Sequence, residues 1–206
     1  MNVAQASVAV VDDDPLVLKS LGRLLQSAGF AVSTFSSALD FLRSCVGHLP
    51  GCVVMDLSMP GVGGLELQHA LTEAADSRPV IFISGHGSVP TSVDAMKAGA
   101  IDFLTKPIDE AKLIGAVRIA LQKDRVAREH RAEQAAITGR VATLTARERE
   151  VLGGVVTGKL NKQIAAELGT AEKTIKVHRA RMMRKMEVGS LAELVRAWTV
   201  TQPSQA

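Results

Sequence analysis

Acidic residues stand in two places where they could do chemistry together. Asp12, Asp13 and Asp14 follow an apolar run near the start of the chain, and Asp56 ends a later apolar run. Carboxylates gathered in one place repel each other unless a cation compensates their charge. Mg²⁺ suits such oxygens because it takes few protein ligands and keeps several waters, and a carboxylate can attack a phosphoryl group as a nucleophile. These residues therefore indicate metal-assisted phosphoryl chemistry.

A hydroxyl and an ammonium group complete this candidate set. Ser84 ends a third apolar run and Lys106 follows a fourth. A lysine acting with Mg²⁺ neutralises the oxygens of a transferring phosphoryl group. Asp14-Pro15 also has a structural interpretation, because Asp is a favoured helix N-cap and Pro suits the first helical position. One aspartate is thus explained without a functional role, whereas the whole set indicates a phosphoryl-transfer site.

Strand and helix patterns alternate over residues 1–121 and would position this set. Short apolar runs predict strands that are covered on both faces: Ser7–Val11, Ala31–Phe35, Cys52–Asp56, Val80–Ser84 and Asp102–Thr105. Amphipathic stretches predict helices at Pro15–Ala28, Ala38–Ser44, Gly64–Ala74, Ser88–Ala98 and from near Asp109. Strand–helix repeats imply a parallel sheet with right-handed crossovers. The predicted class is α/β and doubly wound, with the flavodoxin-like strand order 2-1-3-4-5 taken by analogy.

Four short motifs at the predicted strand ends carry a family resemblance. They are Asp12-Asp13-Asp14, Asp56-Leu57-Ser58-Met59-Pro60 with Gly64, Ser84-Gly85-His86-Gly87, and Lys106-Pro107. The first 120 residues or so thereby resemble the receiver domain of two-component response regulators. The resemblance implies that Asp56 accepts a phosphoryl group from a sensor histidine kinase.

The same resemblance implies a role for each of the other residues. Asp12, Asp13 and Asp56, with the backbone carbonyl of Ser58, would hold Mg²⁺. Lys106 would pair with the phosphoryl group, and the Ser84 hydroxyl would move toward the acyl phosphate. Phe103 stands at the switch position whose ring turns inward on activation, and the peptide bond before Pro107 is commonly cis in the family.

The remainder of the chain divides into a linker and a second, helical domain. Residues 122–142 have good helix-forming composition without a core-facing stripe, so we expect a solvent-exposed helical linker that breaks near Thr138-Gly139. Residues 143–206 predict four helices and no strand. They hold 11 basic and 6 acidic residues, whereas residues 1–121 hold 8 and 12. A basic tail behind an acidic front suggests a polyanionic partner, although a solvated basic face gives the same count.

The second domain contains a helix-turn-helix pattern. Thr145 and Glu148 form a capping box, and Gly158 suits the end of the helix that they begin. A short helix from Asn161 ends at Gly169, and a third runs from about Glu172 to Met186 with basic residues on its outer side. Two helices joined through a glycine, the second basic, are typical of DNA-binding helix-turn-helix units.

Four segments of this domain resemble the DNA-binding domains of LuxR-type regulators. They are Leu144–Glu148, Asn161–Ala165, Lys173–Arg179 and Leu191–Val195. Together with the receiver, the chain resembles the FixJ/NarL class and is nearest to its FixJ- and StyR-like members. The resemblance implies that Lys176, Val177 and Ala180 face base edges in the major groove. It implies further contacts to DNA from Lys173, Thr174, Arg181 and Arg184.

Three other interpretations compete with this one. A haloacid-dehalogenase-like phosphatase also uses an Asp nucleophile and Mg²⁺, but its Asp-x-Asp-x-Thr/Val motif is not matched at Asp12-x-Asp14. A regulator that ignores phosphate would not need the full set of acids, Ser84 and Lys106. Gly153, Gly158 and Lys159 match part of a phosphate-binding P-loop, but Leu160 replaces the required Ser or Thr.

The sequence thus predicts a phospho-accepting transcription factor and not an enzyme, with a receiver (1–121), a helical linker (122–142) and a small all-α DNA-binding domain (143–206). Expected partners are a cognate sensor histidine kinase, double-stranded promoter DNA, RNA polymerase and a second copy of the chain on phosphorylation. Cys45 and Cys52 lack metal-ligand spacing and are expected to be reduced packing residues in a cytoplasmic protein. Without an apolar run of about 20 residues, we expect no membrane span.

Overall fold

The structure is a computed structural model that describes residues 6–44, 50–85 and 89–201. The chain separates into two compact units, Met1–Arg128 and Glu129–Ala206, and each is described here by itself. Cys45, the His86-Gly87 part of the third motif, the expected helix start at Ser88 and the last five residues lie outside the described residues. Within the described part, no helix is both long and apolar enough to span a membrane.

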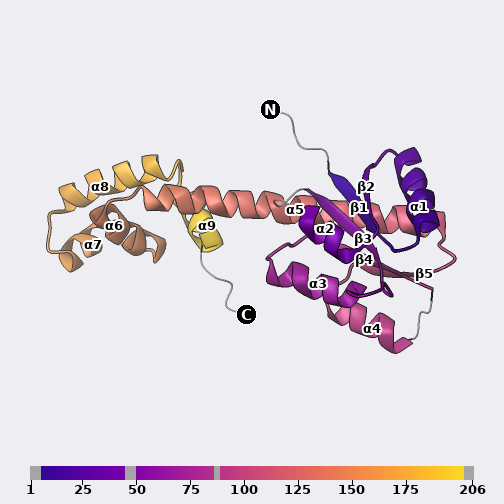
Figure 1. Cartoon of the computed structure of the whole chain (residues 1–206). Helices are drawn as coiled ribbons and strands as arrows, with labels where there is room; N and C mark the ends of the chain where they lie inside the picture. Colours follow the sequence, from indigo (N-terminus) through magenta and orange to yellow (C-terminus); the bar gives the residue numbers. More distant parts are fainter. Residues whose placement is uncertain (1–5, 45–49, 86–88, 202–206) are drawn as a thin grey trace. The chain divides into compact units, whose positions relative to one another are not determined.

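The first unit is built on a parallel sheet of five strands (Figure 1). Its strands are β1 (Ser7–Val11), β2 (Ala31–Phe35), β3 (Gly51–Asp56), β4 (Val80–Ser84) and β5 (Asp102–Thr105). Their order is β2-β1-β3-β4-β5, which confirms the predicted topology. Strands β3 and β4 are buried along their whole length, as strands covered on both faces should be.

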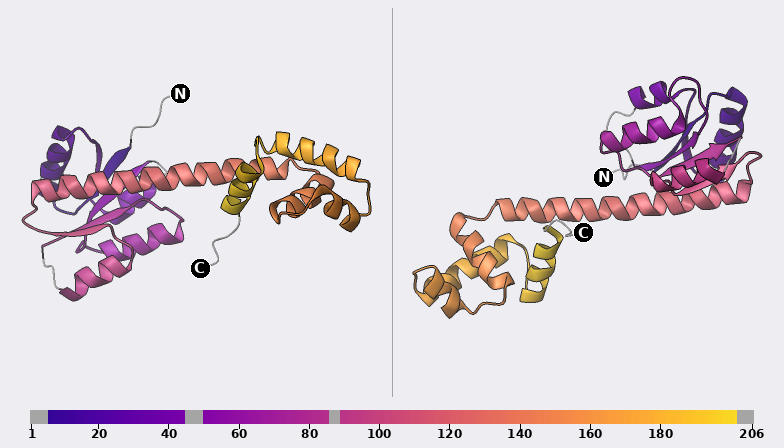
Figure 2. Two further views of the ribbon diagram at one scale, coloured as in Figure 1. Left: turned by 180° about the vertical axis from the view of Figure 1, so that it is seen from behind. Right: turned by 90° about the horizontal axis from the view of Figure 1, so that it is seen from below.

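Helices cover both faces of this sheet (Figures 1 and 2). They are α1 (Pro15–Ser27), α2 (Ala38–Ser44), α3 (Gly64–Glu73), α4 (Val89–Lys97) and α5 (Glu110–Ala142). On one face, Leu25 of α1 and Leu113 of α5 join the buried side chains of the strands. On the other face, Phe41 of α2 and Leu67 of α3 do the same. The two apolar layers fix the sheet, and with it the loops at the carboxyl ends of its strands.

Helix α5 corrects the expectation for the segment 122–142. It is one continuous helix of 33 residues, without the expected break near Thr138-Gly139. The segment is also not solvent-exposed throughout: Asp124 is buried in the first unit, and Ile137 is buried in the core of the second. A single glycine costs a helix only about 1 kcal/mol relative to alanine, and burial of Ile137 one half-turn earlier offsets a cost of that size.

The second unit holds α6 (Ala146–Val156), α7 (Asn161–Glu167), α8 (Glu172–Lys185) and α9 (Leu191–Thr201), which confirms the four predicted helices. Thr145 and Glu148 form the predicted capping box at the start of α6. Gly158 and Gly169 follow α6 and α7 with φ of 81° and 60°, a backbone region that glycine adopts without strain. The core of this unit contains Val151, Ile164 and Ile175, together with Met182, Met186 and Leu194.

Candidate functional site

The carboxyl edge of the sheet brings three of the predicted residues into direct contact. Asp12 follows β1, Asp56 ends β3, and Lys106 follows β5. Lys106 Nζ lies 2.8 Å from Asp12 Oδ2 and 2.8 Å from Asp56 Oδ1. Both carboxylates are buried, with 1% of Asp12 and 4% of Asp56 exposed. One ammonium group thus bridges two buried acids from neighbouring strands, which agrees with the predicted convergence.

Backbone amides hold the remaining oxygens of the two carboxylates. Asp12 Oδ1 accepts a hydrogen bond of 2.9 Å from Asp14 N, and Asp56 Oδ2 accepts one of 2.7 Å from Ser58 N. The Asp14 side chain accepts from Leu16 N at 2.8 Å and caps α1, as its structural interpretation predicted. Local turns after β1 and β3 therefore orient the acids before any partner arrives.

A glycine allows helix α3 to begin against the backbone of Asp56. A Cβ on Gly64 would lie 2.6 Å from the Asp56 carbonyl oxygen and 2.9 Å from the Phe82 ring. Gly64 N donates a 2.9 Å hydrogen bond to the Leu57 carbonyl and closes this turn. A larger residue would push α3 away, so Gly64 positions the loop that carries Asp56 and Ser58.

The other predicted residues of this edge lie at different depths. Ser84 ends β4 and is fully buried, whereas the Asp13 side chain and Ser58 are exposed. Phe103 is half-buried on β5, against the apolar layer that α2 and α3 cover. The Lys106–Pro107 peptide bond is cis, in agreement with the family pattern.

The electrostatics of the edge keep Lys106 charged. Burial by itself would lower the pKa of Lys106, but hydrogen bonds to Asp12 and Asp56 and the charge of both acids raise it above its usual value. The ammonium group consequently stays protonated at neutral pH and neutralises part of the acidic charge. Its donors face oxygens of both acids, which is the place where a transferring phosphoryl group would need a cation.

The donor set at this edge fits Mg²⁺. Asp12 and Asp56 supply hard carboxylate oxygens close enough to share one cation, as their joint contact with Lys106 shows. Among the described residues, no three His, Cys, Asp or Glu side chains already form a metal cluster, and Asp13 is exposed beside the pair. A cation with few protein ligands and several waters is the kind that such a partial set accommodates.

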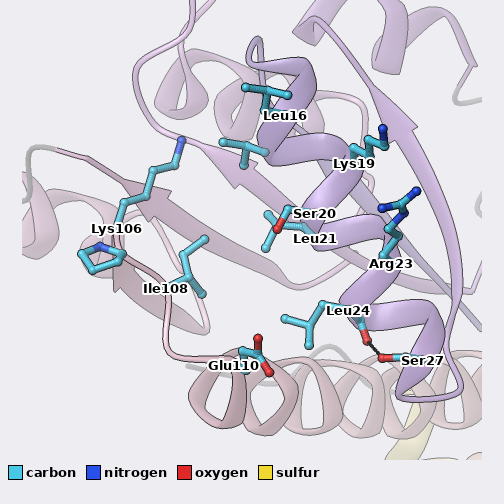
Figure 3. Close-up of a pocket in the computed structure, with 12 residues that line it drawn as sticks. Leu16, Lys19, Ser20, Leu21, Arg23, Leu24, Ser27, Lys106, Ile108 and Glu110 are labelled. Carbon is cyan, nitrogen blue, oxygen red and sulfur yellow. Dashed lines mark hydrogen bonds between the residues drawn. The ribbon is translucent and has the colours of Figure 1, made fainter.

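A groove runs from this edge along helix α1. It measures about 1030 Å³ and is lined by α1 from Leu16 to Ser27 and by the loop from Lys106 to Glu110 (Figure 3). Leu16 stands at its end with 74% of its surface exposed. Lys106 belongs both to the groove and to the acidic site, because it lines the groove and contacts Asp56.

Helix α8 in the second unit presents the other predicted set. Ile175 and Met182 are buried, as expected for its inward side. The exposed residues of α8 are Glu172, Lys173, Thr174, Lys176, Val177, Ala180, Arg181 and Arg184, and all of them except Glu172 are predicted to contact DNA. The structure therefore confirms which side of the helix faces outward.

Three contacts that sequence reasoning missed join the helices of the second unit, and two of them are made by residues of α8. Lys185 Nζ contacts Glu148 Oε2 of α6 at 2.7 Å, and Arg179 donates a 3.1 Å hydrogen bond to Asn161 at the start of α7. Arg147 donates a 2.7 Å hydrogen bond to the Leu168 carbonyl just before the turn at Gly169. Lys185, Arg179 and Arg147 are basic, which is typical of residues that contact solvent or DNA. No pattern in the sequence indicated that they bind groups within the second unit.

Two family models match this chain. The response regulator receiver domain matches residues 8–118, and the luxR family of bacterial regulatory proteins matches residues 142–198. Fold, site and matches together define a two-component response regulator with a luxR-type DNA-binding domain, which belongs to a family of transcription regulators and not to an enzyme family. The receiver domain implies a sensor kinase as partner, and the luxR-family domain implies DNA binding.

Individual relatives agree with this class over nearly the whole chain. Response regulator protein TmoT of Ectopseudomonas mendocina is 45% identical over 197 residues, which cover 95% of this chain and 89% of TmoT. Transcriptional regulatory protein FixJ of Azorhizobium caulinodans is 47% identical over 191 residues, 92% of this chain and 90% of FixJ. The solved structure of response regulator StyR has a TM-score of 0.87 and 46% identity, covering 95% of this chain and 99% of that one. The chain therefore belongs to the FixJ- and StyR-like response regulators.

Proposed function

We propose that Asp56 accepts a phosphoryl group from a sensor histidine kinase and that the phosphorylated chain binds promoter DNA to regulate transcription. The observation that carries this proposal is the bridge from Lys106 to Asp12 and Asp56 at 2.8 Å each. This bridge joins two carboxylates and one ammonium group at the edge of the sheet where ligands of such folds bind, and Asp56 would be the nucleophile among them.

In the transfer step, an Asp56 carboxylate oxygen forms a bond to phosphorus while the bond between phosphorus and the kinase histidine nitrogen breaks. The electron pair of that bond stays on the histidine. Lys106 then pairs with the new phosphoryl oxygens, and the buried Ser84 lies at the neighbouring strand end, within the same edge. Mg²⁺, held by Asp12, Asp13, Asp56 and the Ser58 carbonyl, would neutralise the phosphoryl charge.

Acetyl phosphate tests the acceptor directly. The full-length chain, incubated with acetyl phosphate and Mg²⁺, should gain the mass of one phosphate, and Asp56→Asn should gain none. Asp14→Asn is the matched control, because it makes the same change at a neighbouring acid. Asp14 lies in the run Asp12-Asp13-Asp14 and caps α1, and Asn can cap the helix in its place. A phosphate that persists on Asp56→Asn would refute the assignment.

The groove along α1 is the proposed docking site of the kinase helix that carries the phosphohistidine. It is lined by Lys106, which contacts Asp56, and Leu16 offers it an exposed apolar contact (Figure 3). Leu16→Asp should slow transfer from a phosphorylated sensor kinase and leave labelling by acetyl phosphate unchanged. Leu39→Asp is the control, because Leu39 is also exposed, at 52%, but lies on α2 outside the groove. Equal effects of the two variants would contradict this docking site.

Phosphorylation is proposed to act through Ser84, Phe103 and Lys106 on α4 and β5, and to favour a homodimer through that face. Exposed Val93 and Met96 on α4, 43% and 48% exposed, supply apolar surface for it. A dimer would place two α8 helices on adjacent half-sites and raise the effective concentration for the second contact. Sedimentation of labelled and unlabelled protein should show more dimer after labelling. Identical monomer fractions would refute the coupling.

The division of labour follows from these steps. We assign phospho-acceptance to residues 1–121, the connection to residues 122–142 and DNA binding to residues 143–206, with self-dephosphorylation as the only further chemistry. The phosphorylated chain would recruit RNA polymerase and would therefore activate transcription rather than repress it. The protein would act in the cytoplasm, where kinase, polymerase and promoter meet.

A further inference from the structure

An ion pair lies on the exposed face of α8. Lys176 Nζ is 3.1 Å from Glu172 Oε1, one helical turn away, and the two side chains are 63% and 45% exposed. Pairs of this kind contribute only about 0.3–0.5 kcal/mol to stability. The pair therefore leaves both side chains free to exchange partners when a ligand approaches.

Glu172 differs in charge from the residues around it. It is the one acidic residue of α8, whose other charged residues are all Lys or Arg. The first turn of a recognition helix contacts base edges in the major groove, and Glu172 lies in the first turn of α8. A carboxylate there is repelled by the phosphates of any duplex, so it weakens binding that does not depend on sequence.

The hydrogen-bonding groups of Lys176 and Glu172 suit guanine and cytosine, respectively. A lysine only donates hydrogen bonds and suits the O6 and N7 acceptors of guanine, whereas a carboxylate only accepts and suits the N4 amino group of cytosine. We propose that Glu172 is a specificity-determining residue that accepts from a cytosine amino group beside the guanine contacted by Lys176. This inference rests on the proposed function, in which the exposed face of α8 contacts base edges.

Selection from a library of randomised duplex DNA tests the inference. The full-length chain, treated with acetyl phosphate and Mg²⁺, should select a half-site with a cytosine at one position. Glu172→Ala should lose the preference at that position, and its preference for the selected site over random duplex should fall about 5- to 150-fold, the range for one specific base contact. Glu172→Gln should shift the position toward adenine, because an amide suits adenine N6 and N7.

Glu167→Gln supplies the matched control. Glu167 ends α7, pairs with Lys159 at 2.7 Å and is 52% exposed. Its substitution removes the same charge from an exposed ion pair of the same unit, but outside α8. Binding to selected and random duplex should therefore change by the same factor in this variant. A helix-stabilising role of Glu172 alone would also leave the selected sequence unchanged.

The outcomes separate this inference from the proposed function. If Glu172→Ala and Glu172→Gln select the same site as the natural chain with an unchanged preference, the inference is wrong. If Lys176→Ala loses the guanine preference in that case, contact of α8 with base edges still stands. If Lys176→Ala also selects the unchanged site, the proposed base-facing surface is wrong, and this inference is wrong with it.

Discussion

The two functional regions of this chain differ in how far they are formed before a partner arrives. At the carboxyl edge of the sheet, Asp12 and Asp56 are buried and each oxygen has a fixed partner. On the exposed face of α8, Lys176 and Val177 are exposed to solvent. Transfer of a small phosphoryl group needs atoms fixed in advance, whereas contact with a duplex needs side chains that are free to meet it.

This contrast predicts different responses to substitution. Removing one member of a fixed polar cluster leaves charge uncompensated, so the effect should be nearly all-or-none. Removing one of several exposed contacts should have a graded effect, because each contributes separately.

The largest effect is expected at the acids that are proposed to hold Mg²⁺. Asp13→Ala should abolish labelling by acetyl phosphate, because the phosphoryl charge would be poorly neutralised. The exposed position of Asp13 should leave the fold intact, which circular dichroism can verify. Labelling at the natural rate would remove Asp13 from the proposed metal site and leave only the buried cluster of Asp12, Asp56 and Lys106 on that side of the comparison.

A smaller, graded effect is expected on α8. Lys176→Ala should lose preference for the cognate site over random duplex by about 5- to 150-fold, because it removes a base contact. Arg184→Ala should weaken binding to both duplexes equally and reduce the salt dependence by about one unit of slope, as loss of a phosphate contact does. Titrations at several salt concentrations measure both. The reverse result would mean that α8 is placed wrongly on DNA.

Glu148 is a buried acid in the second unit. Its substitution shows whether burial of a residue, rather than the unit in which it lies, sets the size of the effect on stability. Hydrogen bonds from Lys185 and Thr145 lower its pKa to about 2, below the usual 4.5. The stabilisation is therefore complete above about pH 4.5 and lost as the pH falls toward 2. Glu148→Gln should destabilise the second unit by about 1–3 kcal/mol at pH 7 and remove that part of its acid dependence.

Fluorescence of Trp198 reports this change. Trp198 is the single tryptophan of the chain, and it packs against the core of the second unit. This fluorescence can be used to compare the urea unfolding of Glu148→Gln and Glu150→Gln at pH 7 and at pH 3. Glu150 is exposed and pairs with Arg147, so its substitution should cost less than about 1 kcal/mol. Equal losses in the two variants would show that burial does not decide the effect.

The smallest effect concerns the start of α8. Ala171 is its N-cap and offers no side-chain hydrogen bond. Ala171→Ser should stabilise the second unit by about 0.5–1 kcal/mol, because a serine oxygen satisfies a free amide of the first turn. The same fluorescence measurement detects it. No change in the urea midpoint would mean that the first turn of α8 is already satisfied by water.

Much of the fold was predictable because each strand has a signal within its own short stretch of sequence. Short apolar runs gave β1, β2, β4 and β5 with their observed bounds, and β3 begins one residue before its prediction. The extra residue, Gly51, has φ of 153°, and a Cβ there would lie 2.0 Å from the Ser7 carbonyl oxygen. A glycine before an apolar run gives no sign of such a contact. The acids and Lys106 were predictable because parallel strands bring their carboxyl ends together.

The misjudged parts depend on partners far along the chain. Asp124 accepts a buried 2.9 Å hydrogen bond from Gly51 N, 73 residues away, although an acid in a charged helix is usually solvated. Ile137 is buried in the second unit and Val141 packs against the same core; their spacing of four was a helical signal that composition obscured. Lys185 and Arg147 bind groups on other parts of the second unit, and nothing in the local sequence indicated these partners.

Helix α5 also decides where this polypeptide can be cut into independently folding pieces. A fragment that stops at residue 121 loses Asp124 and leaves the buried Gly51 N–H without its acceptor, at a cost of about 1–3 kcal/mol. One that begins at residue 143 loses Ile137 from its core, at a cost of about 2–5 kcal/mol. A cut between Arg128 and Glu129 keeps both side chains with their partners. The receiver match ends at residue 118, before Asp124, and the luxR-family match begins at residue 142, after Ile137. Fragments cut at these boundaries would lose both residues.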